Sequence, residues 1–74
     1  MVESIRPGIY QHYKGPEYRV MNLVRHSETE EVLVHYECLY PNPAGQFWVR
    51  PLEMFNETVE IEGKTIPRFR YIRD

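Results

Sequence analysis

Residues 32–40 read VLVHYECLY and carry the clearest strand pattern in the chain. Every second residue is apolar or aromatic, whereas His35 and Glu37 fall on the other side. Successive side chains of a β-strand point to opposite faces, so this alternation predicts a strand with one face in a core. The predicted core face consists of Val32, Val34, Tyr36, Cys38 and Tyr40.

Two strand-like segments precede this strand, at residues 9–14 and 17–26, with Gly15 and Pro16 between them. β-Branched and aromatic residues around a Gly-Pro turn predict a β-hairpin. Neither face of 17–26 is cleanly apolar. We therefore expect a bulge near residues 21–22, because one extra residue exchanges the faces beyond it.

Further short elements follow the central strand. Residues 46–50 predict a strand that ends at Pro51, and Pro51 also suits the first position of a helix because its fixed φ fits there. We expect one helical turn near residues 51–56. Residues 58–61 and 65–72 alternate again and predict a final hairpin through Glu62-Gly63.

Short strands of even size predict one all-β domain over residues 1–74. The expected architecture is a small, strongly bent antiparallel sheet of five to six strands, or a partly open SH3-like barrel. An OB-like barrel is the alternative, but it needs a longer helix between its third and fourth strands than residues 41–45 can supply. A 74-residue chain has little core to spare, so dimerisation would add stability.

Composition excludes several classes of protein. The net charge is −2 and there is one cysteine, so neither a disulfide scaffold nor a Cys-rich zinc fold is available. No apolar stretch is long enough for a membrane helix, and residues 1–6 lack the features of a signal peptide. We expect a cytoplasmic protein that needs no cofactor.

Four motifs, in order along the chain, resemble a known family. They are PGIYQHYKG at residues 7–15, RHSET at 25–29, WVRPLEMF at 48–55, and GK at 63–64 followed by PRF at 67–69. With these motifs the chain resembles the small bacterial proteins called domain of unknown function 1653, over nearly its whole length. The resemblance implies no activity, ligand or catalytic residue.

The sequence gives little support for a catalytic or a metal-binding site. The histidines His12, His26 and His35 lack the spacing of a helical or knuckle metal site, so no metal is expected. Residues three apart on a strand point to opposite faces, so His35 does not reach Cys38. Residues 26–28, His-Ser-Glu, are better explained as a turn whose polar groups bind loop N–H groups. We therefore expect a protein without enzymatic activity.

Charge divides the C-terminal third of the chain. Residues 53–62 contain only acidic charges, and the basic residues Lys64, Arg68, Arg70 and Arg73 follow. One explanation is internal, with Glu60 or Glu62 across the final hairpin from Lys64 or Arg68. The other is a basic edge that binds RNA or DNA phosphates, although a net charge of −2 is unusual for such a protein.

The leading functional hypothesis is a non-enzymatic binding module for a protein or peptide. Trp48 and Arg50 lie on the strand face opposite Phe47 and Val49, and exposed Trp and Arg suit such contacts. One shallow surface would then be formed by Tyr13, His26, Glu28, Trp48 and Arg50. In the competing explanation Trp48 caps the core over Pro51 and Phe55, and Arg50 pairs with Glu53 or Glu28.

Two other functions stay open. The C-terminal basic residues are compatible with an RNA- or DNA-associated factor, and a small-molecule-binding protein or enzyme of unknown chemistry is the third reading. A homodimer formed through the last edge strand is compatible with each of them.

Overall fold

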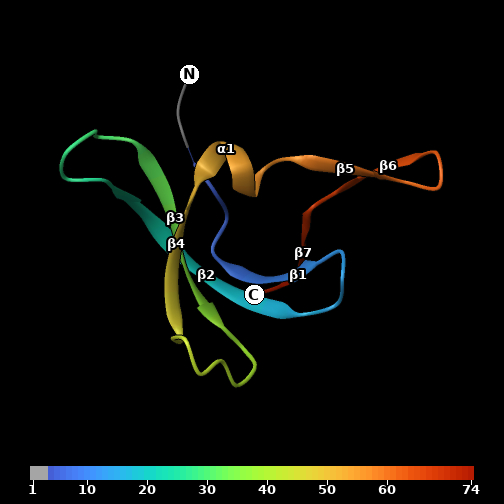
Figure 1. The fold of residues 1–74 in the computed structure, drawn as a ribbon, viewed down its shortest axis with the longest axis horizontal. Coiled ribbons are helices and arrows are strands. Elements are labelled where there is room, and N and C mark those ends of the chain that lie inside the picture. Colours follow the sequence, from blue (N-terminus) through green and yellow to red (C-terminus); the bar gives the residue numbers. More distant parts are fainter. Residues whose placement is uncertain (1–3) are drawn as a thin grey trace.

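The computed structural model describes residues 4–74. This part of the chain contains seven strands and one short helix (Figure 1). In order, they are β1 (Gly8–His12), β2 (Glu17–Arg25), β3 (Val32–Cys38), β4 (Phe47–Pro51), α1 (Leu52–Phe55), β5 (Thr58–Ile61), β6 (Lys64–Pro67) and β7 (Phe69–Arg73). The all-β prediction and the helical turn near residues 51–56 are confirmed. No helix among the described residues is long and apolar enough to cross a membrane.

The main sheet is antiparallel and open. Its strands lie in the order β4-β3-β2-β1-β7, while β5 and β6 form a separate two-stranded sheet. Since β4 and β7 each have a neighbour on one side only, the sheet does not close into a barrel. Figure 1 shows the β5–β6 hairpin projecting to one side of the molecule and the β2–β3 turn projecting to the other.

The bulge expected in β2 is present. Val20 lies opposite Tyr36 and Asn22 lies opposite His35, so Met21 is the extra residue. The bulge exchanges the faces of β2, and Leu23 consequently shares a face with its partner Val34.

The core lies between one face of the main sheet and α1. Its buried residues are Tyr10, Val20, Val34, Tyr36, Leu52, Phe55 and Phe69. Phe55 is only 2% exposed, and its ring stacks on that of Phe69 with the centroids 4.2 Å apart. Each fully buried side chain of this size contributes about 2 kcal/mol. A single helical turn therefore provides an essential part of the core.

The final hairpin differs from the expected one. Its turn residues Glu62 and Gly63 both have positive φ, 51° and 78°, as a two-residue hairpin turn requires. Glu60, however, lies opposite Thr65, and residues 4–74 contain no ion pair from Glu60 or Glu62 to Lys64 or Arg68. The internal ion pairs expected here are therefore absent from the described residues, because a two-residue turn at Glu62-Gly63 puts Thr65 rather than a basic residue opposite Glu60.

The expected strand at 65–72 is divided into β6 and β7. Pro67 ends β6 because it has no N–H, and the N–H of Arg68 donates to the carbonyl of Glu57 at 2.9 Å. β7 then pairs with β1. The two strands approach closely at Gly8, where a Cβ atom would lie 2.7 Å from the Arg73 carbonyl oxygen.

Candidate functional site

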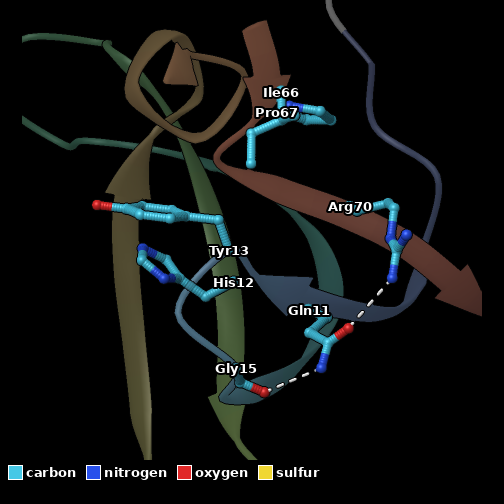
Figure 2. Close-up of a pocket in the computed structure, with 7 residues that line it drawn as sticks. All are labelled: Gln11, His12, Tyr13, Gly15, Ile66, Pro67 and Arg70. Atoms are coloured by element: carbon cyan, nitrogen blue, oxygen red, sulfur yellow. Dashed lines mark hydrogen bonds between the residues drawn. The ribbon is translucent and has the colours of Figure 1, made fainter. Parts of the chain in front are cut away.

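A solvent-open groove of about 380 Å³ runs between the β1–β2 turn and the junction of β6 and β7. It is lined by Gln11, His12, Tyr13, Gly15, Ile66, Pro67 and Arg70, which Figure 2 shows around the opening. We call this feature the basic groove. Its walls combine two aromatic rings, two apolar side chains, an amide and a guanidinium.

The wall formed by Gln11 and Arg70 is held by hydrogen bonds. These two residues are direct partners in the β1–β7 ladder, and Arg70 donates to Gln11 Oε1 at 3.3 Å. Gln11 Nε2 donates in turn to the Gly15 carbonyl at 3.1 Å, so the amide joins the β1–β2 turn to β7 (Figure 2). The arrangement leaves further N–H groups of Arg70 available to a ligand.

His12 and Tyr13 form the opposite wall. Their ring centroids are 4.5 Å apart, and Figure 2 shows the two rings lying side by side. His12 also packs edge-on against Phe69 at 4.9 Å. The backbone N–H of Tyr13 donates to the Arg68 carbonyl at 2.9 Å, which fixes the turn against the start of β7.

Three cations surround this aromatic pair. The Lys14 ammonium lies 5.7 Å from the centre of the Tyr13 ring, and the Arg50 guanidinium lies 5.3 Å from the centre of the Phe69 ring. The positive charge of Arg68 also acts on the His12 ring. We call Lys14, Arg50 and Arg68 the cation cluster. Within residues 4–74, none of the three forms an ion pair with a carboxylate.

This environment changes the pKa of His12. Burial, followed by the positive charges of Arg68, Arg50 and Lys14, lowers the pKa of its imidazole. The backbone N–H of Lys14 donates to His12 Nδ1 at 3.1 Å, so the proton of the neutral ring lies on Nε2. His12 is therefore a neutral hydrogen-bond donor at pH 7.

Arg68 carries a further unsatisfied group. Its Nε atom is buried and has no hydrogen-bond partner among the described residues. A buried N–H without an acceptor costs about 1–3 kcal/mol.

The structure divides the five residues expected to share one shallow surface. Tyr13 and Arg50 both lie close to the His12 ring, whereas His26 and Glu28 lie apart from them. Tyr13 precedes β2, whereas His26 and Glu28 follow it, so the nine-residue strand puts about 30 Å between the two groups. The His26 ring is used within its own turn, where Nδ1 accepts the backbone N–H groups of Glu28 and Thr29 at 3.0 and 3.3 Å. Sequence reasoning identified a polar turn here but not this role of the imidazole.

Trp48 and Arg50 lie on the same face of the sheet as their partners Tyr36 and Val34, which belong to the core. Trp48 is nevertheless 38% exposed because β4 is an edge strand. Its indole N–H donates to the Gly45 carbonyl at 2.9 Å. Trp48 is thus a partly exposed residue at the sheet edge, and Arg50 reaches the aromatic core rather than Glu53 or Glu28.

The four C-terminal basic residues divide into two groups. Arg70 lines the basic groove and Arg68 lies beside it. Lys64 is at the tip of the β5–β6 hairpin, outside the groove, and Arg73 pairs with Glu17 at 3.1 Å. Only the first two are therefore placed with Tyr13.

Sequence reasoning missed Gln11, His12, Ile66 and Pro67 as groove residues. They come together only when β7 pairs with β1, and no local pattern indicates that pairing. Cys38 is buried, as expected for a core residue. Within residues 4–74, no three His, Cys, Asp or Glu side chains lie close enough together to hold a metal ion.

The open five-stranded sheet, the separate hairpin and the groove define the chain as a small all-β domain. The family model described as "Protein of unknown function (DUF1653)" matches residues 8–71, and the chain belongs to this family. The crystal structure of a DUF1653 protein from Bordetella bronchiseptica is similar at 42% identity, with a TM-score of 0.88. That similarity covers 93% of this chain and 88% of the other. No curated protein is similar enough to count as a match.

Proposed function

We propose that this protein is a non-enzymatic binding module that takes a short acidic peptide segment into the basic groove. The observation that carries the proposal is the positive charge around the groove. Arg70 lines it, and Lys14, Arg50 and Arg68 lie near its His12 ring with no carboxylate paired to these three within residues 4–74. Unpaired cations that converge beside a partly buried surface suit an anionic ligand.

The groove residues support two parts of this ligand. Arg70 and the Nε2–H group of His12, which face each other across the groove, suit a carboxylate. Ile66, Pro67 and the Tyr13 ring suit an apolar side chain next to that carboxylate. A volume of about 380 Å³ accommodates one or two peptide side chains.

A peptide is favoured over a nucleic acid by the surrounding charge. The β5–β6 hairpin contributes Ile66 and Pro67 to the groove but also carries Glu60 and Glu62. A continuous phosphate backbone that passed along this hairpin would meet these carboxylates, whereas a peptide with one acidic group avoids them. The chain also has a net charge of −2.

RNA or DNA is the second candidate, on the strength of the His12–Tyr13 pair. Two rings 4.5 Å apart, with Lys14 beside them, could stack an unpaired base and hold its phosphate. The signature of this function is binding that weakens steeply as salt increases.

Selection from random libraries tests the proposal. The immobilised protein is offered random heptapeptides and, in parallel, random single-stranded RNA heptamers, with the Arg70→Glu variant used for counter-selection. We expect peptides that combine an acidic residue with an apolar neighbour. Enrichment of RNA alone would assign the second function, and enrichment of neither pool over the Arg70→Glu variant would contradict both.

A further inference from the structure

The β1–β2 turn, which carries the aromatic wall of the basic groove, is closed by hydrogen bonds. The His12 N–H donates to the Pro16 carbonyl and the Gly15 N–H donates to the His12 carbonyl, each at 2.8 Å. The Lys14 N–H has a side chain as its acceptor, His12 Nδ1 at 3.1 Å. Closure of the turn therefore includes one bond that exists only while Nδ1 carries no proton.

The His12 ring is confined by two other rings. Its centroid lies 4.5 Å from that of Tyr13 and 4.9 Å from that of Phe69, against which it packs edge-on. The ring cannot swing away from the Lys14 N–H without losing these contacts. A proton on Nδ1 would place two donors opposite each other. The backbone of the turn, rather than the ring, is then the part that moves.

The charged groups that act on the His12 ring come from three elements. They are Lys14 on the turn, Arg68 at the β6–β7 junction and Arg50 on β4, and all three are cations. Together with burial they lower the pKa of the imidazole, so the closed turn is the state at pH 7. An imidazolium at this position is repelled by the three cations. Opening the turn moves Lys14 away from the ring and relieves part of that repulsion.

We propose that protonation of His12 opens the β1–β2 turn and displaces the Tyr13 wall of the basic groove. We call this change the His12 switch. Its consequence for binding rests on the proposed function, because the acidic peptide needs the closed wall. Peptide affinity then falls in mild acid. This direction is opposite to the one that an added positive charge alone would give.

The β2–β3 turn provides a matched control. There His26 Nδ1 accepts the backbone N–H groups of Glu28 and Thr29 at 3.0 and 3.3 Å, so an imidazole closes this turn as well. The turn lies at the other end of β2, away from the groove. Asn is the matched replacement at both positions, because its side-chain oxygen accepts an N–H two residues on and does not titrate.

Amide hydrogen exchange of the full chain without ligand tests the His12 switch. It is measured from pH 8 to pH 5 and corrected for intrinsic exchange at each pH. We expect wild type and His26→Asn to lose protection at the Tyr13 and Gly15 amides as pH falls, and His12→Asn to keep it. The amide of buried Val34 should stay strongly protected, which separates opening of the turn from unfolding.

Three outcomes of this measurement would overturn the proposal. They are unchanged protection of the Tyr13 amide in wild type, an equal loss of that protection in His12→Asn, and exchange of Val34 at the same rate as Tyr13. The last outcome would show that the chain unfolds as a whole.

A peptide probe separates the His12 switch from the proposed function. The probe is the dipeptide amide N-acetyl-Leu-Asp, whose carboxyl group has a pKa of about 3.9 and stays largely ionised at pH 5. We expect it to bind wild type at pH 8 and to lose affinity as the Tyr13 amide loses protection. Affinity that rises in acid would contradict the switch. Absence of binding at pH 8 would contradict the proposed peptide function, and hydrogen exchange would still decide the switch.

Discussion

Phe55 and Phe69 stack face to face, with their centroids 4.2 Å apart and their planes 4° from parallel. This contact joins α1 to β7, two elements on either side of the β5–β6 hairpin. Phe69 also contacts His12 and lies under the Arg50 guanidinium. The stacked pair therefore connects the core of the domain to the cation cluster.

Truncation of this pair should be costly. We expect Phe55→Ala to destabilise the domain by about 4 kcal/mol, because it removes a fully buried aromatic side chain. Phe47→Ala is the matched control, since Phe47 is 57% exposed, and should change stability by about 0.5 kcal/mol or less. Urea unfolding of both variants checks the difference. Equal losses would contradict the assignment of Phe55 to the core.

Trp48→Ala should leave the protein folded. The ring is 38% exposed and its main contacts are with Gly45, so we expect a loss of about 1–2 kcal/mol, less than for a buried aromatic residue. Dispersion of the amide NMR spectrum and a thermal melt measure this directly. Global unfolding would instead support a role for Trp48 as a cap on the core.

The β5–β6 turn can be improved. Glu62 has a φ of 51°, a conformation that favours Asn over Glu, so Glu62→Asn should stabilise the domain by about 0.5 kcal/mol. Glu60→Asn, in the adjoining strand, should give no gain. The midpoints of urea unfolding compare the two variants, and an equal gain would show that charge removal rather than turn geometry is responsible.

Stability should fall in mild acid because of His12. Burial and the nearby cations lower the pKa of His12 in the folded state below its unfolded value of about 6.5. Between the folded pKa and the unfolded one, the unfolded chain thus binds more protons than the folded chain. The contribution of His12 to stability is therefore complete above pH ~6.5 and is lost as pH falls through the folded pKa. The free energy of unfolding is compared with that of His12→Gln between pH 8 and pH 5. A wild-type advantage that does not change with pH would rule out this linkage.

Local patterns predicted much of the fold. The Gly15-Pro16 turn, the bulge at Met21 and the helical turn after Pro51 each depend on neighbouring residues, and each is present. The hairpin indicated at Glu62-Gly63 is also present, and its two-residue turn fixes the register in which Glu60 lies opposite Thr65.

The basic groove could not be predicted in this way. Gln11 and Arg70 are 59 residues apart, and only the pairing of β1 with β7 brings them into hydrogen-bond contact. The expected five-residue surface is divided for the complementary reason. His26 and Tyr13 are near each other in sequence, but the extended β2 strand separates them. Both outcomes depend on long-range strand order rather than on local alternation.

The central claim is that the basic groove binds an acidic peptide segment, and an NMR titration tests it most directly. The probes are the dipeptide amides N-acetyl-Leu-Asp and N-acetyl-Leu-Asn, which differ by one charge. We expect the Asp probe to shift the amides of Gln11, Tyr13 and Arg70, and Arg70→Gln to weaken its binding roughly tenfold, as the loss of a charge-assisted hydrogen bond implies. Arg19→Gln, on the exposed surface of β2, is the matched control. Equal shifts with both probes, or shifts away from the groove, would contradict the account.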